Sequence, residues 1–590
     1  MAGFSGWDWA VFAVSLAISL GTGIWAGLVA RKNTAKGDSM ARASEFLMGG
    51  RNMNPIAIAL STTIGALSSI TVLGNAAEMY AYGTQLWMNL IGMSLGFVYV
   101  HLVNLTVLYP LKITSVYTYI ERRFKSKNLR AFTVYTTFIG TFFFMGLCAY
   151  TPSLAMETIT GIPSWASVIV LGVTCTIYSS WGGVRAVVYT DIFQSFVMMG
   201  GLLFIAVTAT IETGGLEKVW SIADAHGRVE WWNINPDPLQ RESFWLVTVQ
   251  GYFLSLLVLG MGQPQVQRVC SVSSWKRAIS THYLNMVLFI AVYSCCYFMG
   301  IAVFSVYADC DPMATGDIST PDQIIPYYTI DKLSVYYGLP GIFIASLYAG
   351  SLSSYSAQIN AVSAVLWEDF FKNSNWVANM AEERRPNVNV LVSVITGTVG
   401  IVAGIIASQL GGIFQMGQTI LGTIHAPLLG LFILGMCCPF ANKIGGTVGF
   451  VTSLTFNLWV TCGTMVYGRP PKTLDFSDAG CNVTTTTMDA LTTYPDFHTT
   501  DLPSTTPDPG NDYVFPLYLV SYTLYALFGV SITFFVGSIV SLIFKPWSTD
   551  VTGKDLVHKT FYNLMRKWEK RYTPEDPAAS SKNLVPLEKY

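Results

Sequence analysis

Two adjacent hydroxyl side chains, Ser353 and Ser354, lie within a long apolar stretch, and Gly350 precedes them by one helical turn. A hard cation such as Na⁺ needs several oxygen ligands but no full negative charge. The segment 55–74 is crowded with glycine, serine and threonine, and it can supply carbonyl oxygens if its helix is unwound. Two simpler interpretations stay open: small residues allow close helix packing, and serine hydroxyls can bond back to their own helix.

Few ionisable residues interrupt the apolar stretches, which makes each of them informative. Asp191 is expected just inside one end of a helix. There it either caps the helix or pairs with Arg185, or it attracts Na⁺ and helps to release it. Glu78 and Glu157 are expected near outer helix ends, in contact with solvent.

His425 lies in another apolar stretch, close to Gln418. It is either a hydrogen-bonded packing residue or a ligand of the transported solute. The chain has no Walker-type box, arginine ladder, histidine-rich or Cys-x-x-Cys cluster, or nucleophile elbow. ATP-driven pumping, voltage sensing and enzymatic activity are therefore disfavoured, and uphill transport would depend on an ion gradient.

Membrane-spanning helices must position these residues. Hydrophobic residues make up 52% of the 590-residue chain and charged residues only 12%. Many stretches reach the ~20 apolar residues that one helix needs to cross a bilayer. We predict an all-α polytopic membrane protein with about thirteen transmembrane helices. Their expected ranges are 8–30, 54–78, 85–109, 131–158, 162–180, 186–212, 242–262, 279–308, 339–366, 389–408, 412–436, 444–467 and 513–544.

Basic residues gather in the loops after the first, third, seventh, ninth and last of these helices. Because cytoplasmic loops carry an excess of lysine and arginine, these loops are predicted to be cytoplasmic. The N-terminus is then extracellular and the C-terminus cytoplasmic, and no lysine or arginine lies deep within a span. The basic residues include Arg31, Lys32, Lys36, Arg42, Arg51, Lys112, Arg122, Arg123, Lys125, Lys127, Arg130, Arg268, Lys276, Arg277 and Lys545.

The opposite loops have features of an extracellular surface. The Thr- and Pro-rich segment 468–512 contains a glycosylation sequon at Asn482, whereas a second sequon at Asn104 lies within an apolar span and is discounted. Cys310 and Cys481 fall in predicted outside loops, an oxidising setting in which they could pair. The first apolar stretch has the length of a spanning helix rather than of a cleaved signal.

Ordered motifs from about residue 8 to 545 resemble the sodium/solute symporter family. The nearest branch resembles the sodium-coupled monocarboxylate, multivitamin and iodide transporters. The motifs include EFLMGGRNM (45–53), ITSVYTYIERRF (113–124), YTPSLAMETITG (150–161), GGVRAVVYTDIFQ (182–194), NPDPLQRESFW (235–245), QVQR (265–268), GLPGIFIASLYAGSLSS (338–354) and GLFILGMCCPFAN (430–442).

The resemblance implies a leucine-transporter-like fold with two inverted repeats of five helices. It divides the chain into an N-terminal part (1–53), a first repeat (54–212), an extracellular loop (213–241), a second repeat (242–436), two C-terminal helices (437–544) and a cytoplasmic tail (545–590). The pair Cys310 and Cys481 also has counterparts in this branch.

The resemblance also implies site residues. Sodium ligands map onto the carbonyl groups of Thr63, Ala66 and Gly350 and the hydroxyl groups of Ser353 and Ser354, with Asp191 near the sodium exit. The solute cavity would include Ser68, Ser69, Thr71, Phe144, Gly262, Gln263, Gln418 and Thr419, joined by His425. Phe144 stands where a tyrosine is expected, and Gln418 resembles sugar carriers, so the sequence departs from the branch at its cavity wall.

We therefore predict a plasma-membrane Na⁺-coupled symporter that imports a small organic anion by alternating access. Because no basic residue is expected in the spans, a carboxylate would be bound by the ends of the broken second and seventh helices and by Na⁺. This favours a monocarboxylate such as lactate, pyruvate or a short-chain fatty acid. Pantothenate, biotin and iodide are alternatives, as is a solute sensor or channel-like protein. Na⁺, the solute and the bilayer are the expected partners. We expect no cofactor, no other metal, no nucleic acid and no obligate protein partner.

Overall fold

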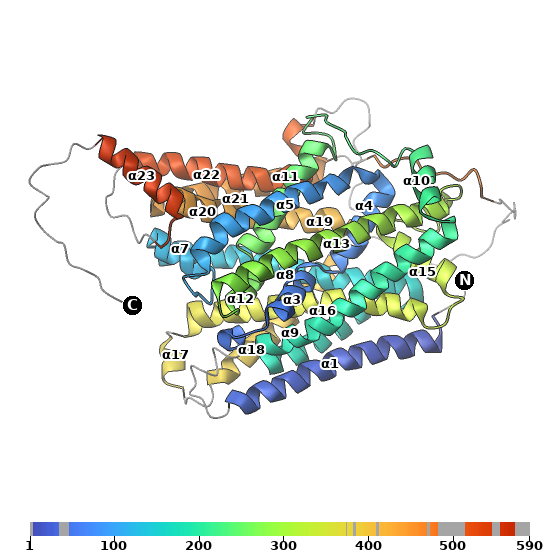
Figure 1. Ribbon diagram of the computed structural model, residues 1–590, viewed down its shortest axis with the longest axis horizontal. Coiled ribbons are helices and arrows are strands. Elements are labelled where there is room, and N and C mark those ends of the chain that lie inside the picture. The colour runs from blue at the N-terminus through green and yellow to red at the C-terminus, as the bar shows by residue number, and fades with distance from the viewer. Residues whose placement is uncertain are drawn as a thin grey trace, which may run out of the picture.

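The computed structural model describes residues 4–34, 47–372, 374–380, 385–408, 412–468, 472–481, 514–544 and 555–572. All regular secondary structure in these ranges is helical, as predicted. The long helices run in roughly the same direction and form one bundle. Helix α1 (Gly6–Thr34) lies along one edge of the bundle and α22 (Tyr525–Phe544) along the opposite edge (Figure 1).

Within the described ranges, eight helices are long and apolar enough to cross a membrane, and the number rises to ten if each of two bent pairs counts as one span. Each overlaps one predicted apolar stretch, and most of their ends differ from the predicted ones by a few residues. The last one begins later than predicted, at Tyr522, after the 3-10 turn Pro516–Tyr518. The eight are Gly6–Val29, Thr84–Leu108, Lys127–Thr160, Gly183–Thr213, Trp275–Tyr307, Asn387–Ala407, Ile413–Cys437 and Tyr522–Phe544.

Further helices complete the bundle and its two ends. They are α5 (Asn89–Tyr99), α7 (Tyr117–Phe124), α8 (Lys127–Thr160), α9 (Ser164–Thr213), α10 (Leu216–Ala225), α13 (Trp275–Tyr307), α15 (Ile324–Leu333), α16 (Leu339–Leu366), α18 (Arg385–Ala407), α19 (Ile413–Ile420), η9 (Leu421–His425), α20 (Ala426–Cys437), α21 (Lys443–Tyr467) and α23 (Lys559–Tyr572).

Helix α16 lies at the centre of the bundle. It packs against α9, α8 and α1, and almost all of its side chains are buried. Six serines and two tyrosines are among these buried residues, which a helix surrounded by protein rather than lipid can tolerate. The residues that the sequence singles out for ion binding are therefore held inside the protein.

Two spans are broken near their middle. Helix α3 (Pro55–Ala66) ends where Leu67 becomes extended, and the chain continues at 61° through η2 (Ile70–Gly74) and α4 (Asn75–Tyr82). Helix α11 (Phe244–Ser255) with η5 (Leu256–Gly260) is followed at 55° by α12 (Gln263–Cys270). Pro264 favours the second break, because proline lacks the amide hydrogen that a continuous helix needs. Both breaks lie in the spans predicted to be broken.

The two ends of the bundle differ in character. The end that carries α7 and α12 is here called the basic end, and the end that carries α10 and α15 is called the disulfide end (Figure 1). At the basic end, the buried guanidinium group of Arg123 donates to the carbonyl oxygens of Gly435 (2.8 Å), Cys438 (2.7 Å) and Ala441 (2.9 Å). It thereby satisfies carbonyl groups that the end of α20 leaves without intrahelical partners.

At the disulfide end, a disulfide joins Cys310 to Cys481, which are 171 residues apart. Backbone bonds from Asp311 to Ser477 and from Gly480 to Asp309 hold the same two segments together. The Asn104 sequon is buried, and its amide donates to the Gly260 carbonyl oxygen, which agrees with its dismissal. Asn482 lies outside the described residues.

We expect mass spectrometry of non-reduced peptides from the surface-expressed protein to recover the Cys310–Cys481 pair as one linked species. The eight other cysteines, most of them buried, should be recovered as free thiols and serve as internal controls. Recovery of Cys310 and Cys481 as free thiols in the same sample would contradict the pairing.

Candidate functional site

Helix α16 meets the broken span α3–η2 directly. The Ser354 hydroxyl donates to the carbonyl oxygen of Ile64 at 3.4 Å, and the hydroxyl oxygens of Ser69 and Ser351 are 2.5 Å apart. A side chain at Gly350 would lie within 3.4 Å of the Ser69 amide, so glycine permits this close approach. The two segments predicted to share a sodium ion thus lie side by side.

The break frees a carbonyl group. In a continuous helix the amide of Ile70 would bond to the carbonyl oxygen of Ala66, but here it bonds to the Ser68 hydroxyl at 3.2 Å. The carbonyl of Thr63 still accepts from the Leu67 amide. The Ala66 carbonyl oxygen and the Ser354 hydroxyl oxygen therefore lie close to the break, and Ser353 is the neighbour of Ser354 in sequence. Neutral oxygen ligands of this kind suit Na⁺.

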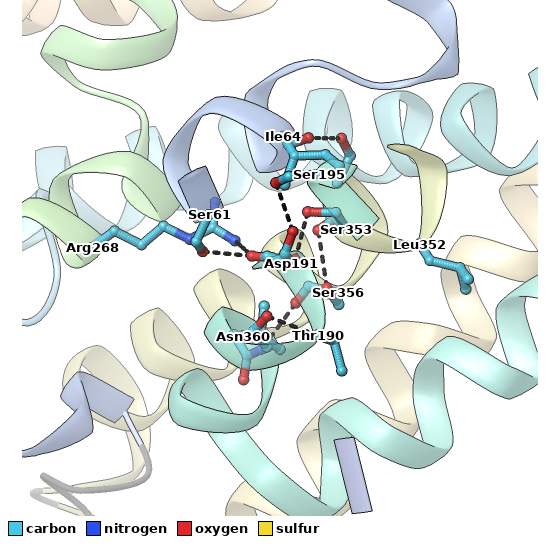
Figure 2. A network of polar contacts seen from close by, with 12 residues as sticks. Ser61, Ile64, Thr190, Asp191, Ser195, Arg268, Leu352, Ser353, Ser356 and Asn360 are labelled. Atoms are coloured by element: carbon cyan, nitrogen blue, oxygen red, sulfur yellow. Dashed lines mark hydrogen bonds and ion pairs between the residues drawn. The ribbon is translucent and has the colours of Figure 1, made fainter. Parts of the chain in front are cut away.

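Asp191 connects four helices (Figure 2). Its carboxylate accepts from the hydroxyl groups of Ser61 (2.5 Å) and Ser353 (2.6 Å) and forms an ion pair with Arg268 at 2.8 Å. The Asp191 side chain is fully buried, and that of Arg268 is only 4% exposed. Helices α3, α9, α12 and α16 thus meet at one carboxylate, next to a candidate ion ligand.

The position of Arg268 corrects two expectations. Arg268 was assigned to a solvated loop, and no basic residue was expected deep within a span, yet its guanidinium group is buried inside the bundle. The partner seen for Asp191 is Arg268 rather than Arg185. The error arose because α12 has the polar sequence QPQVQRVC, which resembles a loop, and because 77 residues separate the two charges.

Several other buried polar atoms near this pair have no hydrogen-bond partner among the described residues. They include Thr62 Oγ1, both amide atoms of Gln194, Arg268 Nη1 and Asn285 Nδ2. Buried polar groups normally have partners, so these unpaired atoms mark a region suited to ordered water. Gln194 lies one turn beyond Asp191, and the sequence analysis did not single it out.

A cavity of about 130 Å³ lies between the break and α12. None of the residues that line it is lysine, arginine, aspartate or glutamate. Of the predicted solute-binding residues, it includes Ser68, Thr71, Phe144, Gly262, Gln263, Gln418 and His425, but not Ser69 or Thr419. It also includes Tyr117, Thr137, Thr141, Ser255, Gln265, Tyr293 and Gln358, which the sequence analysis did not single out as solute-binding residues.

The lining residues differ in what they can offer a solute. The Gln263 amide is already bonded to the backbone at Thr114 (2.7 Å) and Val116 (2.8 Å). By contrast, Nδ1 of His425 and Oε1 of Gln265 have no partner among the described residues. His425 and Gln265 are therefore two lining residues with hydrogen-bonding capacity that the protein does not use.

Towards the disulfide end, Arg241 and Glu78 form a largely buried ion pair. Arg241 pairs with Glu78 on α4, donates to Gln415 on α19 at 3.2 Å, and lies 4.2 Å from the ring centre of Tyr82. The expectation that Glu78 is solvated is wrong, because its side chain is only 6% exposed. Burial and the nearby charge of Glu78 raise the pKa of Glu242, which follows Arg241.

Comparisons with known proteins agree with this geometry. The profile of the sodium:solute symporter family matches residues 46–452. Human sodium-coupled monocarboxylate transporter 1 is 36% identical over 553 residues, which cover 91% of this chain and 87% of the relative. The human sodium/iodide cotransporter is 34% identical over 595 residues, which cover 99% of this chain and 90% of the relative.

Solved structures show the same fold. A substrate-bound, outward-open Na⁺-coupled sialic acid symporter has a TM-score of 0.68 at 20% identity and covers 92% of this chain and 98% of its own. MHP1, a nucleobase-cation-symport-1 family transporter, has a TM-score of 0.51 at 9% identity and covers 87% of this chain and 97% of its own. The profile spans most of the chain and the relatives exceed 30% identity, so the chain belongs to the sodium:solute symporter family and is a multi-pass, sodium-coupled solute symporter rather than an enzyme.

Proposed function

We propose that the protein imports a small monocarboxylate, such as lactate, pyruvate or a short-chain fatty acid, together with Na⁺ by alternating access. The size of the cavity is the observation that supports this most. About 130 Å³ is close to the ~150 Å³ of an apolar cavity that accommodates benzene, a molecule of six heavy atoms. A solute of a few heavy atoms suits that space, whereas pantothenate or biotin would require the cavity to expand. Similarity to a monocarboxylate transporter supports the same substrate class.

The broken helices offer a way to hold an anion without a basic side chain in the cavity. The second halves of both broken spans begin beside it, at Ile70 and Gln263. The positive end of the helix dipole favours a carboxylate at such starts. His425 and Gln265 would add hydrogen bonds. The apolar remainder of the wall suits a short hydrocarbon chain.

For the ion, we propose a sodium site formed by the carbonyl groups of Thr63, Ala66 and Gly350 and the hydroxyl groups of Ser353 and Ser354. Asp191 lies one hydrogen bond from Ser353, on the side towards Arg268. While Arg268 neutralises this carboxylate, Asp191 attracts a cation weakly. Separation of Asp191 from Arg268 would leave the negative charge of the carboxylate uncompensated. The carboxylate would then draw Na⁺ away from the site towards the basic end.

We further propose thirteen spanning helices, with the basic end cytoplasmic, the disulfide end extracellular, and the protein in the plasma membrane. Counting α16, α21 and the first part of α9, Ser164–Ser180, with the ten spans gives that number. The two broken spans open the proposed halves 54–212 and 242–436, as two related repeats require. A disulfide also suits an oxidising exterior.

Iodide is a second candidate, because the sodium/iodide cotransporter matches 99% of this chain and the cavity wall is largely apolar. A halide needs fewer hydrogen-bond donors than the cavity offers. Uptake measurements separate the two candidates directly.

We expect cells expressing the chain to accumulate lactate, pyruvate or butyrate in sodium medium above the external concentration, and not in choline medium. An electrical potential adds about 2.3 kcal/mol per charge per 100 mV to the driving force. The panel should also contain nicotinate, pantothenate, biotin, iodide, glucose and choline. Saturable sodium-dependent uptake of iodide, glucose or choline, without uptake of any monocarboxylate, would overturn the proposed substrate. Equilibration without accumulation would indicate a channel-like protein instead.

A further inference from the structure

Helix α23 has no role in the transport mechanism proposed above. Its sequence, KTFYNLMRKWEKRY, contains five basic residues and one acidic residue. At 3.6 residues per turn, its apolar and basic residues separate onto opposite faces. In the part with described side chains, the apolar face carries Phe561, Leu564 and Met565, and the basic face carries Lys559, Arg566 and Lys567.

Helix α23 starts at a fixed position on the basic end of the bundle. Just before it, the His558 amide donates to the Met436 carbonyl oxygen, and the Tyr119 hydroxyl donates to the Leu556 carbonyl oxygen, both at 3.0 Å. Val557, between them, is buried. Figure 1 places α23 at the same end as α7 and oblique to the long axis of the bundle. A helix that begins at the end of a transmembrane bundle lies at the level of the lipid headgroups.

The apolar face of α23 is incompletely covered by protein. Leu564 is 62% exposed, and Phe561 and Met565 are half-buried. Lys559, Arg566 and Lys567 are exposed. An apolar face flanked by lysine and arginine is the pattern of helices that lie in the membrane interface, with apolar side chains at the acyl boundary and basic ones at the phosphates. Its charge complements an anionic lipid surface and not a neutral one.

We propose that α23 binds the headgroups of anionic phospholipids in the leaflet at the basic end of the protein. Leu564, with Phe561 and Met565, enters the boundary between headgroups and acyl chains, while Lys559, Arg566 and Lys567 contact phosphate and carboxylate groups. If the basic end is cytoplasmic, as proposed above, this leaflet is the one that carries phosphatidylserine. The surface binds lipid whether or not the transported solute is a monocarboxylate.

The test is hydrogen exchange, followed by mass spectrometry, on the full-length protein in nanodiscs of phosphatidylcholine with or without phosphatidylserine. Each basic residue near an anionic surface strengthens binding by about fivefold, so amides 559–567 should exchange at least about tenfold more slowly in the anionic discs. High salt should reduce the difference, because it screens exposed charges.

Matched variants test whether the basic and apolar side chains of α23 cause this difference in exchange rate. Arg566→Glu with Lys567→Glu should abolish the effect of phosphatidylserine, whereas Arg566→Lys with Lys567→Arg should keep it. Lys218→Glu, an exposed change on α10 at the opposite end, should also keep it. Leu564→Asn should weaken protection in the anionic discs. Equal exchange rates in the two lipid mixtures, or a difference that survives the charge reversal, would overturn the proposal and show that protein contacts alone hold α23.

Discussion

Arg268→Gln should nearly abolish sodium-dependent uptake and sharply lower the amount of protein at the cell surface. The change leaves Asp191 charged, buried and without its ion-pair partner. Removal of one member of a buried pair costs about 3–5 kcal/mol, which corresponds to a factor of hundreds or more in an equilibrium constant. Surface biotinylation and uptake per surface molecule measure the two effects separately.

The double variant Asp191→Asn with Arg268→Gln distinguishes folding from ion handling. With both charges removed, the burial penalty disappears, and surface expression should largely recover. The sodium dependence of uptake should stay altered, because the carboxylate beside Ser353 is gone. Lys218→Gln, an exposed change far from the pair, serves as the control. Wild-type expression and uptake in the Arg268→Gln single variant would refute a role for the ion pair.

Ser353→Ala and Ser354→Ala should each raise the sodium concentration for half-maximal uptake by about 5- to 150-fold. Loss of one oxygen ligand from a dehydrated cation is comparable to leaving a buried polar group unpaired, about 1–3 kcal/mol. Ser353→Ala also removes a hydrogen bond to Asp191. Uptake is measured as a function of sodium at a fixed solute concentration and corrected for surface expression.

Ser356→Ala is the matched control on the same helix. Its hydroxyl donates to the Ser353 carbonyl oxygen of its own helix, so its loss should change sodium dependence little. A double variant of Ser353 and Ser354 with wild-type sodium dependence would exclude both residues as ligands. An equal shift in Ser356→Ala would assign the effect to helix packing.

The sequence predicts the features that depend on local composition. The apolar stretches give the spanning helices. The density of Gly, Ser and Thr in 55–74 is compatible with close packing or with an unwound segment, and the structure has a break there, after Ala66. The proximity of Ser354 to that break was predicted from the resemblance and is present in the structure. The disulfide between Cys310 and Cys481 is likewise predicted from the resemblance and from the location of both residues in loops on the same predicted side of the membrane, and it is present in the structure.

The contacts that the sequence did not reveal join distant segments. The sequence around Glu78 does not indicate that Arg241, 163 residues later in the chain, forms an ion pair with it. Nothing near Asp191 points to Arg268. Both arginines lie next to helix ends with polar neighbours, where a solvated position is the usual outcome. Burial of such a charge is decided by which helices pack together, and a hydropathy pattern does not contain that information.

The contacts of Arg123 affect the order in which the protein assembles during its synthesis. Its guanidinium group is synthesised more than 300 residues before the carbonyl groups at the end of α20 that it binds. At roughly 5–20 residues per second, the ribosome needs about 15–60 s to produce them. During that interval the Arg123 guanidinium group on α7 lacks its native hydrogen-bond acceptors. The carbonyl groups at the end of α20 bind this group only after most of the chain has been synthesised. Assembly of this end of the bundle is therefore a late event in biosynthesis.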